Sequence, residues 1–325
     1  MVRWGIIGGG HMASVFAQSI KEVNNAKLVS VSSKNYKNLE TICNELKIDQ
    51  KLRFNSYEKI CESNEVDAIY ISTLNNTHFD LIKLCAINNK NILCEKPFCL
   101  NLKEGLEIQK IINENKVMFF EAIAYLSHTQ TDQTLNLINN DEIGEVEVIE
   151  CSFGFKVRKI DPKSRLFSKK LGGGAILDVG CYPLSFASLF VKNKKKMEFK
   201  NIDGEMCHTN VDISASTNLL INNKIKCKIQ ISLKENFKNN LIIKGSKGSI
   251  IINNPWLPDK KVFLEILGNN RYYKNFINSR LSVYANQIKN VSNEFLKIEN
   301  NNRLFDVTKS VENMTYLDHW KKNIK

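Results

Sequence analysis

An acid and a phenol lie four residues apart in the stretch that follows a run of three glycines at residues 172–174. They are Asp178 and Tyr182, and on a helix two residues with this spacing share one face. The residues around them are apolar, and such a pair is unusual on the buried face of a helix. Two interpretations stay open: the pair belongs to a chemical site, or Asp178 caps a neighbouring loop while Tyr182 is merely packed.

A second candidate site is the glycine turn near the start of the chain, which has the form G-x-G-x-x-A. A short apolar strand beginning at Trp4 leads into it, and a helical pattern follows from Ala13 to Val23. Gly8 permits a tight turn, Gly10 lets the backbone approach a pyrophosphate, and Ala13 keeps the helix close to its strand. Because a further strand pattern follows, the turn predicts a dinucleotide site in a βαβ unit.

Strand and helix patterns alternate through the first part of the chain, which predicts a parallel sheet with helices on both faces. The expected strands are 28–32, 68–73, 91–94 and 117–121, and the expected helices are 37–46, 77–88 and 102–113. Ligands in this architecture lie beyond the carboxyl ends of the strands. Chemistry is therefore expected at the glycine turn, at the end of the second strand, and at Thr73–His78 and Glu95–Pro97.

The end of the second strand bears on which cofactor is bound. A protein that selects NAD places an Asp or Glu about twenty residues beyond the glycine turn, where it binds the ribose hydroxyl. This chain has Ser33 and Lys34 there and no carboxylate. A hydroxyl and an ammonium suit a 2′-phosphate, so we favour NADP(H), with NAD(H) as the alternative.

After Glu121 the pattern changes to strand runs without regular helices between them. The expected strands are 144–155, 212–220, 224–234, 240–244 and 248–253, and the expected helices lie near 135–139, 175–191, 279–297 and 304–320. This pattern predicts a mostly antiparallel sheet with a few helices against it. We expect two domains, residues 1–121 and 122–325.

The formal net charge of +12 comes mostly from dispersed lysines, with one cluster at Lys192–Lys196. No nucleic-acid-binding motif accompanies the cluster. A solvated lysine surface is the favoured interpretation, and binding of anionic small molecules is the alternative. We expect no nucleic-acid partner.

The nine cysteines form no C-x-x-C pair, which suits reduced thiols in a cytoplasmic protein. No His and carboxylate pattern indicates a metal site. The glycine turn stands too close to Met1 for a signal peptide, and the longest apolar stretch, 175–191, is broken by Asp178 and Pro183. No membrane span is expected.

Taken together, these motifs resemble the Gfo/Idh/MocA family of NAD(P)-dependent oxidoreductases over essentially the whole chain. The motifs are the glycine turn, Asn75-x-x-His78, Glu95-Lys96-Pro97, Glu121-Ala122 and the stretch from Gly173 to Pro183. The order and separations match most closely the branch of dihydrodiol dehydrogenases and NADP-dependent xylose dehydrogenases. The resemblance implies a Rossmann domain followed by an α/β domain whose large, open, mostly antiparallel sheet pairs subunits into homodimers or homotetramers.

The resemblance also implies site residues. Lys96, Asp178 and Tyr182 are the expected catalytic residues, with Tyr182 as acid/base and the Lys96 ammonium lowering its pKa. A cis bond before Pro97 is expected. The expected cofactor contacts are Gly8, Gly10, His11, Met12, Ala13, Ser33, Lys34, Thr73, Asn75, His78, Glu95 and Lys96.

Departures from the family pattern leave the substrate open. Tyr125 and His128 match the motif after Glu121-Ala122, but Leu126 and Thr129 stand where the family has arginine and proline. Tyr125, His128, Arg165 and Asp178 are the expected substrate contacts, and His128 is the alternative acid/base. Arg165 is otherwise a surface cation.

The sequence thus predicts an NADP(H)-preferring oxidoreductase that transfers hydride between nicotinamide and a hydroxyl or carbonyl carbon of a sugar, nucleotide-sugar or cyclic polyol. Two alternatives remain. One is a non-catalytic NAD(P)-binding regulatory protein, and the other is a glycoside hydrolase of the same fold that uses NAD without net oxidation.

Overall fold

The computed structural model describes residues 1–191, 197–268 and 271–324 of the chain. The cluster Lys192–Lys196 therefore lies outside the described residues. The chain packs into two units, one formed by residues 1–127 with 281–312 and the other by residues 128–280 with 313–325.

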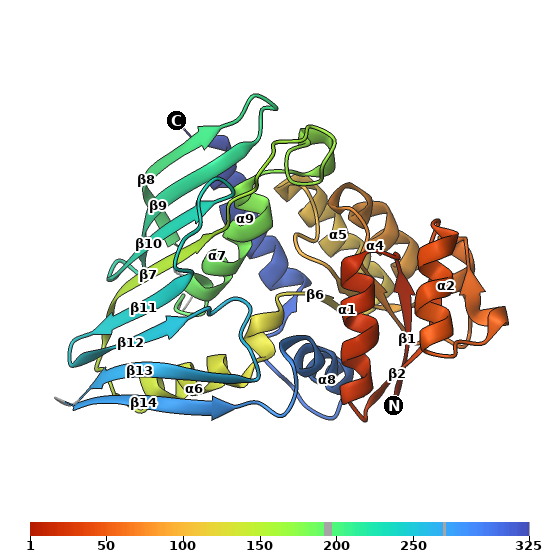
Figure 1. Cartoon of the computed structure of the whole chain (residues 1–325), viewed down its shortest axis with the longest axis horizontal. Coiled ribbons are helices and arrows are strands. Elements are labelled where there is room, and N and C mark those ends of the chain that lie inside the picture. Colours follow the sequence, from red (N-terminus) through yellow and green to blue (C-terminus); the bar gives the residue numbers. More distant parts are fainter. Residues whose placement is uncertain (192–196, 269–270, 325) are drawn as a thin grey trace. The chain divides into compact units, whose positions relative to one another are not determined.

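The first unit is built on a seven-stranded sheet with the spatial order β15-β6-β5-β4-β1-β2-β3 (Figure 1). Its strands are β1 (Val2–Ile7), β2 (Ala26–Ser32), β3 (Arg53–Phe54), β4 (Ala68–Ile71), β5 (Asn91–Cys94), β6 (Phe119–Glu121) and β15 (Phe305–Asp306). All neighbours are parallel except β15 and β6. The order changes direction at β1, the kind of switch point where doubly wound sheets bind ligands. The predicted Rossmann-type parallel sheet is confirmed.

Four of the six helices of this unit begin at a polar residue whose side chain caps the helix. The six helices are α1 (His11–Ser19), α2 (Tyr36–Glu45), α3 (Tyr57–Glu62), α4 (His78–Ile87), α5 (Leu102–Asn115) and α8 (Val283–Phe295), with the short turns η1 (Ile20–Glu22), η2 (Gln50–Leu52), η3 (Asn75–Thr77) and η4 (Ala124–Ser127). Asn35, Ser56, Asn101 and Ser282 each accept a hydrogen bond from the backbone N–H three residues later. No side chain caps α1, and α4 follows directly on η3.

Side chains on the strands alternate between two apolar layers, as expected for a sheet with helices on both faces. Tyr70 of β4 and Trp4 of β1 belong to the layer under α1, α2 and α8, whereas Ile69 and Ile71 point to the opposite face. The ring of Phe16 stacks on Tyr70 with centroids 4.2 Å apart. This core fixes the strands whose carboxyl ends carry the predicted site residues.

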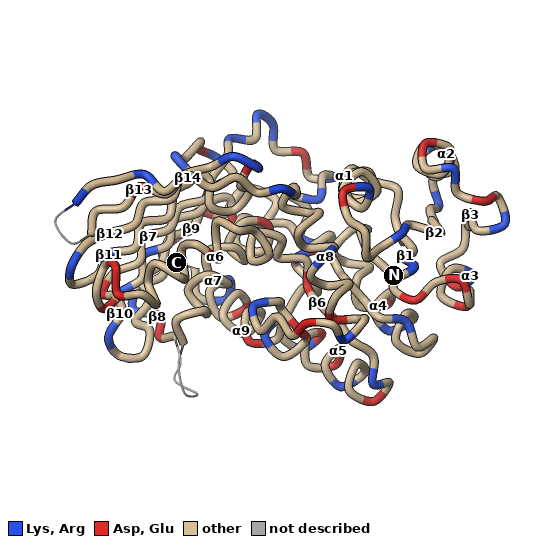
Figure 2. The backbone as a smooth tube through the Cα atoms, turned by 90° about the horizontal axis from the view of Figure 1, so that it is seen from below, with Lys and Arg blue, Asp and Glu red and all other residues tan. Residues whose placement is uncertain are grey.

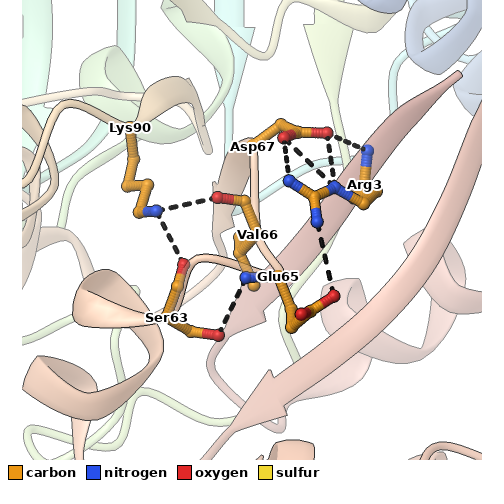
Figure 3. Close-up of polar contacts among 6 residues, drawn as sticks. All are labelled: Arg3, Ser63, Glu65, Val66, Asp67 and Lys90. Carbon is orange, nitrogen blue, oxygen red and sulfur yellow. Dashed lines mark hydrogen bonds and ion pairs between the residues drawn. The ribbon is translucent and has the colours of Figure 1, made fainter.

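The amino-terminal edge of the sheet is held by a network of polar contacts (Figure 3). The Arg3 guanidinium donates to the Asp67 carboxylate, with Nη2 2.7 Å from Oδ1. Lys90 Nζ donates to the backbone oxygens of Ser63 and Val66 at 2.7 and 2.8 Å. These contacts fix the segment that enters β4, at the opposite edge from the predicted site.

The second unit is built on an eight-stranded sheet with the order β14-β13-β12-β11-β7-β10-β9-β8 (Figure 1). Its strands are β7 (Val146–Gly154), β8 (Met197–Met206), β9 (Asp212–Ile221), β10 (Ile225–Ser232), β11 (Asn240–Gly245), β12 (Gly248–Asn253), β13 (Lys261–Gly268) and β14 (Arg271–Asn278). Only β7 and β10 pair in parallel. The predicted mostly antiparallel sheet is confirmed, but β8, β13 and β14 were not predicted from the sequence.

Helices cover one face of this second sheet. They are α6 (Thr129–Asn139), the π-helical turn η6 (Ile176–Gly180), α7 (Cys181–Ser188) and the end of α9 (Val307–Lys322) (Figure 1). The short turn η5 (Lys169–Leu171) lies in the loop that precedes η6. Along β10 the residues Cys227, Ile229 and Ile231 are buried, whereas Lys226 and Lys228 between them are exposed. The other face of the sheet is therefore open, as expected.

The division into units differs from the boundary expected at residue 121. The first unit extends to Ser127, and residues 281–312 return to it from the far end of the chain. The return is held by packing: Trp4 Nε1 donates to Ser292 Oγ at 3.0 Å, and the Trp4 and Phe295 ring centroids lie 5.5 Å apart. A sequence pattern read in order cannot reveal such a return, because it depends on contacts between residues far apart.

Charged residues are spread over the strands and helices of both units (Figure 2). Within the described residues no helix combines the length and the apolar character that crossing a bilayer requires. All nine cysteines are described, buried and free.

Candidate active site

The glycine turn between β1 and α1 has the geometry that a dinucleotide phosphate requires. Gly8 has a φ of +121°, and a Cβ there would lie 2.7 Å from the Ser72 backbone oxygen. Gly10 precedes α1, and a Cβ built on it would meet nothing within 4 Å. The first N–H groups of α1 have no side-chain cap, so they can receive an anion at the positive end of the helix. The residues present therefore fit a dinucleotide cofactor.

Three of the stretches singled out from the sequence meet at the same edge of the parallel sheet. The N–H of Ser72 donates to Ile7 O and the N–H of Glu95 donates to Ile71 O, each at 2.9 Å. Thr73 and Asn75 follow Ser72, and the Thr73 hydroxyl lies 2.7 Å from that of Thr77. The loops after β1, β4 and β5 thus lie side by side, as predicted for a ligand site at a switch point.

The turn that carries Lys96 is held on both sides by buried side chains. The Lys96–Pro97 bond is cis, as predicted. His78 Nδ1 lies 2.9 Å from Pro97 O, and Glu121 Oε1 accepts from the Phe98 N–H at 3.1 Å. Burial lowers the pKa of His78 to about 4 and raises that of Glu121 to about 7. His78 is therefore a neutral donor that fixes the turn, and it is not exposed toward a cofactor.

Glu95 lies beside two phenols of the first unit. The Tyr70 hydroxyl donates to Glu95 Oε1 at 2.5 Å. The second phenol is Tyr284 of α8. Burial raises its pKa, the nearby charge of Glu95 raises it further, and the charge of Lys96 lowers it. Tyr284 was not predicted as a site residue, because only the return of residues 281–312 to this unit brings it to Lys96.

The predicted ribose-binding residues have different environments. Ser33 is buried, its hydroxyl accepts from the Asn35 N–H at 3.1 Å, and it leaves no room for a side chain at Gly9. Lys34 is exposed at the end of β2, with Nζ 5.1 Å from the centre of the Tyr57 ring. Lys34 is thus the group available to an anion, whereas Ser33 shapes the turn.

The remaining predicted cofactor residues lie on the first turn of α1. His11 is exposed, Met12 is half-buried and Ala13 is fully buried against the sheet. Ala13 therefore has the packing role that the motif assigns to it.

Asp178 and Tyr182 belong to the second unit and follow the glycine run. Asp178 lies in the π-helical turn η6 and Tyr182 in the first turn of α7, and both are buried. The Tyr182 ring packs edge-on against Phe153, with centroids 5.3 Å apart, and lies 6.4 Å from Trp256. π-Helical turns are rare and often occur at functional sites. The sequence spacing predicted a helix here but not its π-helical start.

Arg165 pairs with Asp178 across the glycine run. Its Nη1 donates to Asp178 Oδ1 at 2.7 Å, and the Arg165 side chain remains 51% exposed while that of Asp178 is 8% exposed. This contact with the predicted catalytic aspartate favours the interpretation of Arg165 as a site residue over that of a surface cation.

Tyr125 and His128, the other predicted substrate contacts, are almost completely buried. His128 caps α6, and its Nδ1 accepts from the Gln130 N–H at 3.1 Å. Burial lowers its pKa to about 4, so the ring is neutral and carries its proton on Nε2. Within the described residues Nε2 has no hydrogen-bond partner. His128 is therefore suited to donate a hydrogen bond and poorly suited to act as a base.

No group of three or more His, Cys, Asp or Glu side chains capable of holding a metal ion occurs in the part of the chain that the structure describes. The first unit offers phosphate-binding backbone groups and the Lys96 ammonium, and the second unit offers the Tyr182 phenol. These groups suit nicotinamide-dependent proton and hydride chemistry.

Comparison with known proteins identifies both parts of the chain. Residues 2–123 match the model of the oxidoreductase family with an NAD-binding Rossmann fold, and residues 132–251 match the GFO/IDH/MocA C-terminal domain. The trans-1,2-dihydrobenzene-1,2-diol dehydrogenase of Xenopus tropicalis is 27% identical over 79% of this chain and 77% of its own. The Mus musculus enzyme of the same name is 25% identical over 91% and 90%.

Solved structures share the fold at lower identity. KijD10, a 3-ketoreductase from Actinomadura kijaniata crystallised with NADP and TDP-benzene, has a TM-score of 0.87 and 18% identity over 100% of this chain and 98% of its own. The aldose-aldose oxidoreductase of Caulobacter crescentus has a TM-score of 0.90 and 16% identity over 99% and 96%. With both of its parts matched and its relatives in the predicted branch, the chain belongs to the Gfo/Idh/MocA family of NAD(P)-dependent oxidoreductases.

Proposed function

We propose that the protein is an NADP(H)-preferring dehydrogenase or reductase that transfers hydride between nicotinamide and a hydroxyl or carbonyl carbon of a sugar, nucleotide-sugar or cyclic polyol. The observation that carries the proposal is the uncapped start of α1 at Gly10, which lies at the same sheet edge as Lys96. The compounds in the names and titles of these relatives support this class: a dihydrobenzene diol, the TDP-benzene bound to KijD10, and aldoses.

In this proposal Tyr182 exchanges the proton of the reacting hydroxyl, and Lys96 favours the phenolate and orients the substrate. The bound cofactor supplies the hydride acceptor or donor. Asp178, held by Arg165, binds a second hydroxyl. The neutral, buried ring of His128 supports Tyr182 rather than His128 as the acid/base.

Replacing Tyr182 by Phe tests the acid/base role. The substitution keeps the packing against Phe153 and removes only the hydroxyl, so we expect kcat to fall by roughly 100-fold or more with the NADPH dissociation constant unchanged. Tyr36→Phe, on the exposed face of α2, is the matched control. A Tyr182→Phe enzyme with unchanged kinetics would move the role to another group.

Cofactor preference rests on Lys34, the exposed cation at the end of β2. Lys34→Glu places a carboxylate where the 2′-phosphate of NADP would bind, and it should reverse the ratio of NADPH to NADH affinities. The ratio is measured by the fluorescence of the reduced cofactors on titration. A ratio that does not change would assign the preference elsewhere.

The open face of the second sheet supports assembly into a homodimer or homotetramer. Leu267, Tyr272 and Phe276 are 51%, 61% and 75% exposed there, and exposed apolar groups of this kind mark interaction surfaces. Light scattering should show a dimer or tetramer, and Phe276→Asp should shift it toward monomers.

The nine free, buried cysteines support a reducing compartment such as the cytoplasm.

A further inference from the structure

The segment from Lys156 to Lys170 is the most basic stretch among the described residues of the second unit. It contains seven Lys and Arg residues and one Asp in fifteen positions, a net charge of +6 and half of the chain's formal +12. All seven cationic side chains belong to exposed residues.

Six of these seven cations form no ion pair with a described residue, whereas some other surface lysines do. Lys200, Lys234 and Lys247, for example, pair with nearby carboxylates. In the basic segment, Arg165 pairs with Asp178. The other six cations have no ion pair with any described residue: Lys156, Arg158, Lys159, Lys163, Lys169 and Lys170. These six exposed cations are thus available to an anionic ligand.

The segment is fixed at both ends. At its start, the Val157 N–H donates to Leu233 O at 2.9 Å, beyond the end of β10. At its end, the N–H groups of Gly173 and Gly174 donate to Ser168 O and Leu166 O at 3.0 and 2.9 Å. A Cβ on Gly173 would lie 2.6 Å from Leu166 O, so only glycine permits this close approach. The cations are therefore presented by an ordered loop and not by a free tail.

The same loop reaches the predicted catalytic motif. Gly173 and Gly174 lead directly into the π-helical turn that carries Asp178, and Arg165 of the loop donates to that carboxylate at 2.7 Å. Arg165 thus connects the basic segment to the aspartate that we expect to bind the carbohydrate.

We propose that residues 156–170 bind a phosphate or diphosphate group of the substrate, which makes the substrate a phosphorylated or nucleotide-linked carbohydrate. The proposal rests on the proposed function and specifies its substrate class. A phosphate suits unpaired Lys and Arg side chains on an ordered loop, because it offers several acceptor oxygens and a charge of up to −2. A neutral polyol would leave the six cations without partners.

The experiment measures binding of inorganic pyrophosphate to the full-length protein saturated with NADPH, so that the glycine turn is already occupied. We expect calorimetric titration to show binding that weakens roughly fivefold in Arg158→Gln/Lys159→Gln. Lys83→Gln/Lys103→Gln removes the same charge from exposed positions on α4 and α5, and it should leave the affinity unchanged. No binding to the wild-type protein, or equal weakening in both variants, would overturn the proposal.

Two further measurements separate this proposal from the proposed function and from nucleic-acid binding. With an aldose and its phosphate ester as substrates, kcat/KM should favour the ester by tenfold or more, and Arg158→Gln/Lys159→Gln should reduce only the rate with the ester. Absence of turnover with pyrophosphate binding intact would count against the proposed function alone. Tighter binding of a single-stranded DNA oligonucleotide, lost in the same variant, would overturn the small-molecule assignment.

Discussion

Lys96 is held in place through residues that touch its turn. His78, at the start of α4, hydrogen-bonds to the backbone oxygen of Pro97, and Glu121, at the end of β6, accepts from the backbone N–H of Phe98. Both side chains are buried. The sequence indicated Lys96 through its motif, and it gave His78 a place near the cofactor. It could not show that His78 and Glu121 fix the turn, because that role depends on which backbone atoms they reach.

The buried carboxyl of Glu121 predicts a pH-dependent stability. Burial raises its pKa to about 7 in the folded protein, above its value in the unfolded chain. The folded state therefore binds the proton more tightly, and the free energy of unfolding falls as pH rises from about 4.5 to 7. Glu121→Gln cannot ionise, so relative to wild type it should gain on the order of 3 kcal/mol between pH 5 and pH 8.

Urea unfolding at the two pH values measures this difference. Glu107→Gln, an exposed substitution on α5, is the control and should show no pH-dependent gain. A difference between Glu121→Gln and wild type that is the same at both pH values would show that Glu121 ionises normally.

At the scale of elements, the two outer glycines of the turn have different physical duties. Gly8 needs its positive φ and its close approach to Ser72, whereas Gly10 has open space around its Cα. We expect Gly10→Ala to keep the thermal midpoint within about 2 °C and to weaken NADPH binding by roughly tenfold, because the added methyl occupies phosphate space. Gly8→Ala should instead destabilise the fold.

Thermal unfolding and NADPH titration of the two variants check this contrast. If Gly10→Ala binds NADPH as tightly as wild type, the phosphate does not lie over Gly10. If Gly8→Ala is as stable as wild type, the turn does not depend on the left-handed backbone at that residue.

Many of the elements could be predicted from sequence periodicity. Alternating apolar residues located β7 and β9 to β12, and the glycine turn located β1 and α1. β14 was not predicted because most of its residues are exposed. β8 was not predicted because it has few buried residues and follows a lysine-rich stretch, so its sequence shows no apolar face. The π-helical turn at Asp178 was also not predicted, because helical periodicity does not distinguish π from α geometry over five residues.

At the scale of the whole molecule, residues far apart in sequence build the first unit. Phe295 packs against both Trp4 and Phe120, with ring centroids 5.5 and 5.7 Å apart. Phe295 is partly buried, so Phe295→Ala should destabilise the nucleotide-binding unit by about 2 kcal/mol, although the residue lies far along the chain from Trp4. A single boundary at residue 121 therefore does not describe the first unit, because that unit also contains residues 281–312.

Urea unfolding monitored by loss of NADPH binding measures this effect on the first unit. Leu106→Ala, on the exposed face of α5, should cost less than about 0.5 kcal/mol and serves as the control. Equal stability of Phe295→Ala and wild type would mean that the returning helix contributes little to that unit.

The account depends on hydride transfer to nicotinamide assisted by Lys96. The most direct test is mass spectrometry of the cofactor after incubation of the enzyme with NADP and carbohydrates deuterated at the reacting carbon. We predict deuterium in the NADPH formed by the wild-type enzyme, and none with Lys96→Met even though that variant still binds NADPH. Deuterium transfer by Lys96→Met at the wild-type rate, or none by the wild-type enzyme with any phosphorylated or plain carbohydrate, would contradict the account.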